Sequence, residues 1–364
     1  MSIVTILIFL AVLSLLVFVH EFGHFITAKR AGVKVEEFGF GFPPCAFGIK
    51  KGGTVYSINW LPLGGFVKIK GESGQDWEDK DSFSNKKIWK RMLIVGAGVL
   101  MNVFLTAVLL AIGAGAGMPR VVPEEDRFAR VKDDSIEVVS VLSNSPAEKA
   151  GIMEGDAVAA IDGVSFGKIE EARAYIASKE EVQIKIKREE LELVKSIKTE
   201  ELKEAGRRGI GVALLHTGIV SYPWYIAPLK GIEETGIYIR EISFAFGRII
   251  GDMFVGRPVS VDLQGPVGIA VLTGRVARLG FVYLLQFTAL LSINLAFINI
   301  FPFPALDGGR ILFLAIEGIR KKPVPKKVEA MIHNIGFILL ITLVIIVTFR
   351  DILRYGGGFL DRFN

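Results

Sequence analysis

Two short motifs carry the residues whose types and spacing can do chemistry. The first is His20-Glu21-Phe22-Gly23-His24, in which two histidines are four residues apart. Residues four apart share one face of a helix, so both imidazoles can bind one metal ion. Glu21 points about a quarter turn away, where its carboxylate can act as a general base on a water molecule. This motif predicts a metal-dependent hydrolase.

The second motif, Asn299–Gly308 (NIFPFPALDG), follows a long apolar segment. A catalytic zinc needs one more protein ligand beside two histidines, and Asp307 is the candidate. Pro302 and Pro304 prevent a regular helix through this stretch. Irregular backbone at membrane depth is tolerated where it lines a cavity. The alternative interpretation is that Asp307 only begins an Asp-Gly-Gly turn.

The elements that must position these motifs are apolar helices. The chain has 364 residues, of which 51% are hydrophobic and 22% charged, which is too apolar for an ordinary soluble enzyme. Stretches long enough to cross a bilayer lie at about residues 3–28, 92–117, 281–300 and 331–349. We therefore expect a polytopic α-helical membrane protein with about four transmembrane helices.

The distribution of Lys and Arg indicates how these helices are oriented. Segment 29–91 holds 12 Lys/Arg against 7 Asp/Glu, and segment 305–330 holds 6 against 3. Segment 119–280 holds 22 against 25. The positive-inside rule then places the two basic segments in the cytoplasm, and both termini and 119–280 outside. We expect a bacterial cytoplasmic (inner) membrane protein. Its net charge of +5 reflects orientation in the lipid bilayer, and no nucleic-acid partner is expected.

Residues 133–216 have the pattern of a compact, mostly β domain. Within them, NSPAEKAGIMEGDAVAAIDG resembles the core of a PDZ domain in its circularly permuted form. PDZ domains add an extended peptide as a strand and often hold its C-terminal carboxylate. The resemblance implies that Gly209, Ile210 and Gly211 belong to a peptide-binding loop that accepts peptide C-termini. A folded spacer without a peptide ligand is the alternative.

Four regions follow from these patterns. They are an N-terminal membrane core over residues 1–118, an extracytoplasmic PDZ domain over 119–217, an amphipathic helix and linker over 218–280, and a C-terminal membrane core over 281–364. The helix expected at 233–254 either lies in the membrane interface or packs on the other helices.

The two chemical motifs together resemble those of the site-2 proteases, a family of intramembrane zinc metalloproteases. The resemblance extends over nearly the whole chain and includes Gly39–Pro43, Leu63–Val67 and Gly265–Gly268. One departure is visible, because the family often has Gly-Pro-x-x-Asn where this chain has Gly98-Val99-Leu100-Met101-Asn102. The bend that the proline would cause is not expected here.

The resemblance implies a role for each motif residue. Zn²⁺ would be held by His20, His24 and Asp307, with Glu21 activating the water. The remaining implied residues bind substrate: Asn299, Pro302 and Pro304.

A β-hairpin region over residues 47–70 is expected to dip toward the membrane. Its edge can pair with an unwound substrate strand, which suits regulated intramembrane proteolysis of single-pass membrane proteins of the anti-sigma factor type. The alternatives are an ordinary cytoplasmic hairpin and, for the whole protein, a non-proteolytic PDZ-bearing scaffold. A metal transporter is less favoured, because no repeat of spans is visible. We interpret His216 and His333 as structural.

Overall fold

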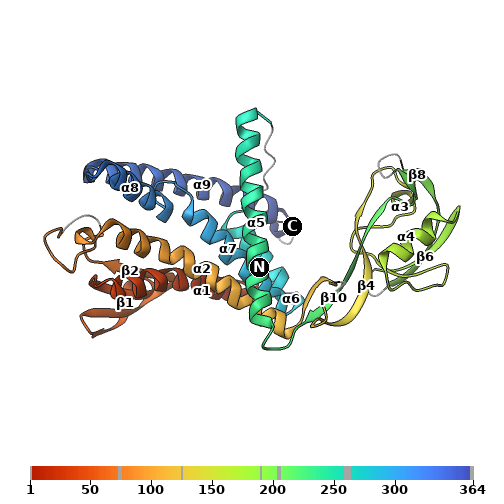
Figure 1. The fold of residues 1–364 in the computed structure, drawn as a ribbon, viewed down its shortest axis with the longest axis horizontal. Coiled ribbons are helices and arrows are strands. Elements are labelled where there is room, and N and C mark those ends of the chain that lie inside the picture. The colour runs from red at the N-terminus through yellow and green to blue at the C-terminus, as the bar shows by residue number, and fades with distance from the viewer. Residues whose placement is uncertain are drawn as a thin grey trace. The chain divides into compact units, whose positions relative to one another are not determined.

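The protein is described by a computed structural model covering residues 2–72, 76–123, 126–188, 191–202, 206–257 and 264–360. It divides into two compact units (Figure 1). Unit 1 comprises Met1–Ile112 and Pro228–Asn364, and unit 2 comprises Gly113–Ala227.

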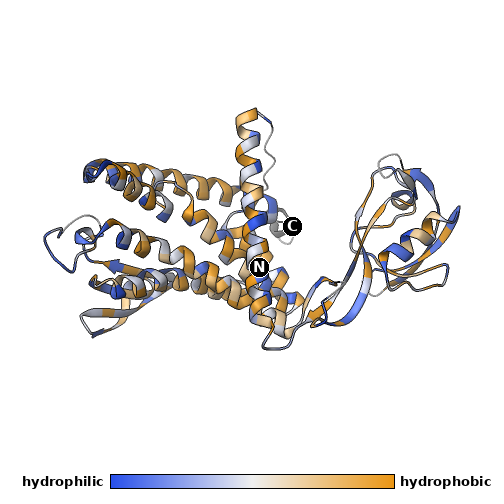
Figure 2. Cartoon of the chain, in the orientation of Figure 1, coloured by the Kyte–Doolittle hydropathy of each residue, from blue (hydrophilic) through white to orange (hydrophobic). Residues whose placement is uncertain are grey.

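In the described part of the chain, four helices are long and apolar enough to cross a membrane. They are α1 (Ile3–Arg30), α2 (Ile88–Ala116), α7 (Phe281–Ile300) and α9 (Lys326–Leu360). Apolar residues run along most of their length (Figure 2). This confirms the four expected helices. The first turn of α9 lies outside the predicted stretch because it contains Lys326 and Lys327.

Small and hydroxyl-bearing residues bring α1, α2 and α7 together. A Cβ on Gly23 of α1 would overlap the Ala97 carbonyl of α2 and lie 2.7 Å from Met101 Cγ. Ser292 of α7 donates its hydroxyl to the Asn102 carbonyl at 2.9 Å. Close backbone approach and interhelical hydrogen bonds are what hold helices together where no water drives their association.

Shorter helices complete unit 1: α6 (Pro266–Leu279) and α8 (Asp307–Arg320). At the start of α6, the Gly268 amide donates to Asp351 Oδ2 on α9 at 2.7 Å. Further along, Gly274 lies against Thr5 of α1, where a Cβ would be 2.9 Å from Thr5 Oγ1. The sequence interpretation missed both helices because neither is long or apolar enough to stand out.

Helix α5 (Ala227–Val255) crosses other helices of unit 1 (Figure 1). Gly231 lies against α2, because a Cβ there would be 2.7 Å from the Ala111 nitrogen. Phe246 stacks on Phe297 of α7 with 6.1 Å between ring centroids. The helix expected at 233–254 is therefore present, and it packs on the bundle at these two points.

Strands β1 (Val35–Lys51) and β2 (Thr54–Ile69) form a sheet of their own, joined by Gly52 and Gly53, which have φ of +57° and +79°. Phe38 pairs with both Val67 and Tyr56, so the first half of β1 lies between the two halves of β2. The sheet begins earlier than the expected hairpin because residues 35–42 join it. A short 3₁₀ helix, Phe83–Asn85, follows.

Unit 2 is built on a six-stranded sheet with the order β3-β10-β4-β5-β6-β7. Its strands are β3 (Met118–Val121), β4 (Arg130–Val141), β5 (Ala157–Ile161), β6 (Glu181–Arg188), β7 (Leu191–Lys198) and β10 (Val212–Ser221). A second small sheet pairs β8 (Glu200–Leu202) with β9 (Arg207–Gly209).

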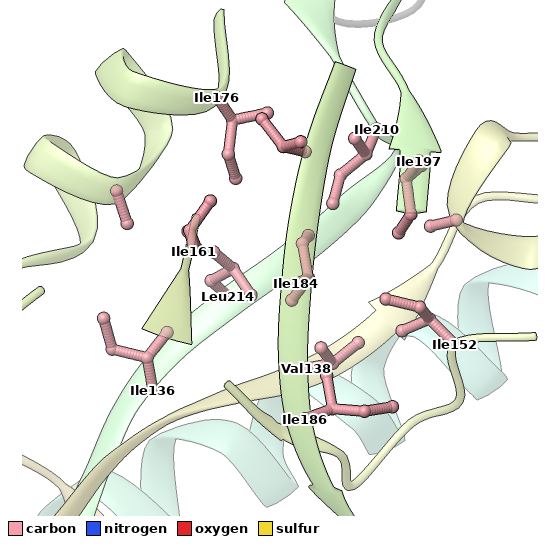
Figure 3. Close-up of a cluster of buried hydrophobic side chains, with 13 residues drawn as sticks. Ile136, Val138, Ile152, Ile161, Ile176, Ile184, Ile186, Ile197, Ile210 and Leu214 are labelled. Carbon is pink, nitrogen blue, oxygen red and sulfur yellow. The ribbon is translucent and has the colours of Figure 1, made fainter. Parts of the chain in front are cut away.

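In the described part of unit 2, two helices lie entirely within it, α3 (Pro146–Lys149) and α4 (Ile169–Ala177). Alternate residues of β6 point into the core, where Ile184 and Ile186 belong to the same cluster of buried side chains as Ile176 of α4 (Figure 3). The alternation of buried and exposed positions along β6 is the pattern of a strand with one buried face.

Candidate metal centre and peptide groove

Two helices and one loop bring three donor atoms together in unit 1. His20 Nε2 and His24 Nε2 are 3.2 Å apart, and Asp307 Oδ2 lies 3.0 Å and 3.4 Å from them respectively. Zinc–ligand bonds of 2.0–2.1 Å in a tetrahedron require donor atoms about 3.3 Å apart. The three atoms therefore form one face of a tetrahedron that fits Zn²⁺ and leaves a fourth position.

The burial of this triangle also fits a cation. His20 and His24 are each 7% exposed. Asp307 Oδ2 is buried and, apart from the two imidazoles, has no hydrogen-bond partner among the described residues. A buried carboxylate oxygen is costly without a partner. Glu21 completes a group with the histidines whose ligand atoms all lie within 4.8 Å of one another.

Asp307 reaches the histidines because the backbone before it is irregular and the residues after it are small. It is the first residue of α8, not part of an isolated turn. A Cβ on Gly308 would overlap the Ile300 carbonyl group, and one on Gly309 would lie 2.9 Å from the Phe303 carbonyl carbon. Only glycines allow α8 to start this close to the end of α7.

Hydrogen bonds on the far side of each imidazole set its orientation. His24 Nδ1 lies 2.8 Å from the Ile94 carbonyl oxygen, which can only accept, so Nδ1 carries the proton. His24 Nε2 then keeps its lone pair for a metal. His20 Nδ1 lies 3.3 Å from Nδ2 of the fully buried Asn102 carboxamide, whose Oδ1 has no hydrogen-bond partner among the described residues. Rotating this carboxamide by 180° exchanges its nitrogen and oxygen, so that Oδ1 accepts from Nδ1–H and His20 Nε2 keeps its lone pair for a metal in the same way.

A cavity of ≈ 500 Å³ opens beside the triangle. Glu21, His24 and Asp307 line it on one side. The other lining residues come from β2, the segment after it, α2, the loop before α8, α8 and α9: Phe66, Val67, Ile69, Glu72, Phe83, Ile94, Val95, Ala305, Arg310, His333, Asn334 and Phe337. A base, two corners of the donor triangle and a strand thus share one space that can hold a peptide and water.

The structure separates the predicted site residues into two groups. It brings together the proposed ligands and Glu21. Asn299, Pro302 and Pro304 are not among the residues that line the cavity. Pro302 is exposed, and Pro304 packs against α9, where a Cβ on Gly336 would be 2.6 Å from the Pro304 carbonyl oxygen. Their role in substrate binding stays a prediction.

Several residues around the cavity were not predicted. Arg310 on α8 forms an ion pair with Glu72, which follows β2. His333, interpreted as structural from its position near a segment end, lines the cavity and accepts a hydrogen bond from the Ala305 amide. No local spacing marks these residues, because only the tertiary fold brings them to the site. By contrast, His216 pairs with Asp134 at 3.0 Å on unit 2.

A second cavity, of ≈ 440 Å³, lies in unit 2 between α4 and the start of β10. Gly209, Ile210 and Gly211 all line it. Gly211 has a φ of +84°, and its carbonyl accepts from the Leu142 amide at 2.8 Å. Residues 212–216 pair with β4, whereas β3 pairs with 217–220. In the described residues, the start of β10 therefore has one edge without a strand partner.

Comparison with known proteins identifies relatives across the whole chain. Residues 8–343 match the family described as Peptidase family M50. A putative zinc metalloprotease of Clostridium perfringens is 36% identical, covering 93% of this chain and 96% of the relative. The zinc metalloprotease RasP of Geobacillus kaustophilus is 32% identical, covering 95% and 97%. The regulator of sigma-W protease RasP of Bacillus subtilis is 30% identical, covering 96% and 98%.

Solved structures match about a quarter of the chain. The PDZ domain of an SdrC-like protein from Listeria monocytogenes is 32% identical, with a TM-score of 0.22, covering 23% of this chain and 92% of that one. The second domain of the Listeria protein Lin2157 is 38% identical, with a TM-score of 0.20, covering 23% and 87%.

Proposed function

The chain belongs to Peptidase family M50 and is a zinc metalloprotease, and from this premise we propose that it cleaves single-pass membrane proteins within or near their transmembrane segment. The observation that carries the proposal is the triangle of His20, His24 and Asp307. Both histidines lie on a helix apolar enough to cross a membrane, and Asp307 follows the end of another after the short stretch Phe301–Leu306. Ionisable groups in such surroundings are costly and usually functional.

In this proposal His20, His24 and Asp307 hold the zinc, and Glu21 is the general base. Zinc, when bound, supplies Lewis acidity that polarises a peptide carbonyl and makes water easier to deprotonate. Glu21 takes a proton from the attacking water and returns it to the leaving amine. Asn299, Pro302 and Pro304 shape the adjoining substrate path, as the family resemblance implies.

The substrate helix must unwind before cleavage, because each of its carbonyls is hydrogen-bonded within the helix. The second half of β2 is suited to receive the unwound strand. Phe66, Val67 and Ile69 line the cavity, and Gly64 fits against Val17 of α1. Elsewhere in the sheet Trp60 is 71% exposed. An exposed indole there supports a sheet that dips into the membrane, where aromatic side chains favour the interface.

A second activity proposed for the chain is peptide binding by unit 2, as a PDZ-type domain. The cavity beside α4 supports it, as does the start of β10, which has one edge without a strand partner among the described residues, since strand addition needs a free edge with a groove beside it. Extended peptides, including C-termini left by an earlier cleavage, are the proposed ligands. The name of the Bacillus subtilis relative, regulator of sigma-W protease, favours anti-sigma factors as the substrate type.

The proposed location is the bacterial cytoplasmic membrane. The excess of Lys and Arg in 29–91 and 305–330 supports a zinc site toward the cytoplasm, with both termini and the PDZ-type domain outside. The proposed regions remain a membrane core over 1–118 and 281–364, a PDZ-type domain over 119–217, and a linker with an amphipathic helix over 218–280.

Cleavage of a single-pass membrane protein by the purified chain in lipid tests this function. Wild type is expected to cleave, to stop on chelation of zinc, and to recover when zinc is restored. Glu21→Gln should keep its zinc and lose cleavage, because an amide cannot accept the proton. Equal cleavage by both proteins would remove Glu21 as the base. A Glu21→Gln variant that keeps full function in cells would favour the alternative that the protein is a non-proteolytic, PDZ-bearing scaffold.

A further inference from the structure

The residue two positions before Asp307 has an unusual backbone. Ala305 has a φ of +76°, in the left-handed region that residues other than glycine rarely adopt. Such a conformation persists only where its surroundings hold it. The amide of Ala305 donates a hydrogen bond to His333 Nδ1 at 2.9 Å. That bond connects the loop before Asp307 to α9.

Helix α9 holds the same loop at a second point. Gly336 lies three residues after His333, on the same face of the helix, and receives Pro304. A Cβ on Gly336 would be 2.6 Å from the Pro304 carbonyl oxygen, so only glycine allows this approach. The His333 ring also packs on Phe313 of α8, with 5.4 Å between centroids. Two adjacent residues of the loop, Pro304 and Ala305, are thus held by one helix.

We propose that His333 is a positioning residue for the metal centre, which acts by holding Ala305 so that the Asp307 carboxylate stays in the donor triangle. This inference rests on the proposed function, in which Asp307 binds zinc. Because the Ala305 amide can only donate, His333 Nδ1 must carry a lone pair, and the neutral ring has its proton on Nε2. Nε2 is buried and has no hydrogen-bond partner among the described residues, so the ring can hold the loop only through the hydrogen bond that Nδ1 accepts from Ala305.

The physical reason for such a residue lies in the course of the chain. The stretch Phe301–Leu306 lies between two helices and belongs to no helix or strand, and its internal backbone hydrogen bonds are turn bonds such as that from the Leu306 amide to the Phe303 carbonyl. Asp307 lies at its end, and its oxygen must stay within a few tenths of an ångström of the right place to bind a metal. Partners that orient a ligand typically change metal affinity 10–100-fold when removed.

Three substitutions in the full-length protein test the proposal, and the Co²⁺ absorption spectrum and competition for zinc with a chelator are the readouts. His333→Phe keeps a ring against Phe313 but removes the acceptor. The side-chain oxygen introduced by His333→Asn takes roughly the place of Nδ1 and can accept from Ala305. Asp307→Ala is the reference for loss of the ligand itself.

We expect His333→Phe to weaken zinc binding about 10–100-fold and to change the Co²⁺ spectrum. His333→Asn should restore affinity to within about threefold of wild type, which a role in packing alone would not explain. Wild-type affinity in His333→Phe would overturn the inference, as would equal weakening by His333→Phe and His333→Asn. If His333→Phe does not fold, as judged by thermal unfolding, the smaller His333→Leu takes its place with the same expected outcomes.

The Asp307→Ala reference distinguishes a failure of the proposed ligand set from a failure of the proposed role of His333. If it binds zinc as tightly as wild type, the ligand set itself is wrong and the inference about His333 falls with it. If it loses zinc while His333→Phe keeps it, the proposed function stands and only the inference is overturned.

Discussion

Gly98 of α2 lies directly against the ring of His24 on α1. A Cβ at Gly98 would overlap His24 Nε2, the atom that faces Asp307, and would lie 2.7 Å from His20 Cε1. Such contacts are shorter than any that real side chains make. The absence of a side chain at Gly98 is therefore what lets both imidazoles occupy the space between the two helices.

Gly98→Ala is the first test of this relationship, and α2 supplies its own control. A methyl group at Gly98 must displace His24 or separate α1 from α2, so we expect zinc affinity to fall at least about tenfold. Gly96→Ala places the same methyl group two residues earlier, where the nearest atom is Ile311 Cδ1 at 3.9 Å. That variant should bind zinc normally. Equal zinc affinities in the two variants would show that the helices adjust freely.

The second prediction concerns Asn102 and the tautomer of His20. Asn102→Leu removes the carboxamide beside His20 Nδ1, which keeps the proton on Nδ1 when its oxygen faces the ring, so in this variant the proton can move to Nε2 and compete with the metal. We expect zinc affinity to fall about 10–100-fold. Asn102→Asp keeps an acceptor for Nδ1–H and should retain more affinity than the leucine variant. Because the chain has only four histidines, ¹⁵N-histidine NMR spectra can follow the tautomer directly.

Equal losses in Asn102→Leu and Asn102→Asp would contradict this role and would point to packing between α2 and α7. Asn102 does contribute to that packing through its backbone, since its carbonyl accepts from Ser292 and Thr106, each at 2.9 Å. The backbone contacts are the same in both variants. A difference between the two therefore comes from the side chain.

The parts of this site that sequence predicted are those with a local signature. Hydropathy over about 20 residues is a local property, so α1, α2 and α7 were expected close to their observed bounds. The spacing of His20 and His24 is likewise local. The proximity of Asp307 was inferred from the need for a third ligand and from its place after an apolar segment, and the family resemblance supported it. Its irregular approach was foreseen from prolines, whereas the left-handed Ala305 was not.

Contacts across the bundle had no such signature. His333 is a single histidine in a long apolar helix, and no spacing rule connects it to Ala305. The sheet was similarly underestimated, because residues 35–42 become a strand only by pairing with both halves of β2. β-Structure depends on its partners more than a helix does, so short strands are the hardest elements to foresee.

The third prediction concerns the ion pair between Glu72 and Arg310. It connects the segment after β2 to α8, and both residues line the cavity. Glu72→Gln removes this ion pair, so the segment after β2 is held less firmly against α8. We expect the rate of cleavage to fall about fivefold, equivalent to the ~1 kcal/mol that a partly exposed ion pair contributes. Glu36→Gln removes an exposed ion pair with Lys68 on the same sheet and is the matched control. If both variants cleave equally well, the Glu72 pair does not contribute to the site.

The last prediction is a pH dependence in unit 2, away from the metal centre. Asp156 is 1% exposed and accepts from Arg188 Nε and Nη2 at 2.7 and 2.8 Å, and from the Met153 amide at 2.9 Å. The hydrogen bonds from Arg188 are the main cause that holds the pKa of Asp156 below its usual value. A lowered native pKa stabilises the folded state above the unfolded pKa of about 3.9. That contribution is lost as the pH falls through the native pKa.

Asp156→Asn should therefore destabilise unit 2 by about 1–3 kcal/mol at pH 7, because Arg188 loses a charged acceptor. The difference in stability between this variant and wild type should shrink at pH 3, because protonation of Asp156 then begins to remove the stabilisation that its carboxylate gives the wild type. Amide hydrogen exchange of strands β4 and β6 in the full-length protein measures the loss of stability at both pH values. Glu192→Gln, which removes an exposed pair with Lys185, should change neither. An effect of Asp156→Asn that is equal at both pH values would mean that shape, and not charge, makes Asp156 important.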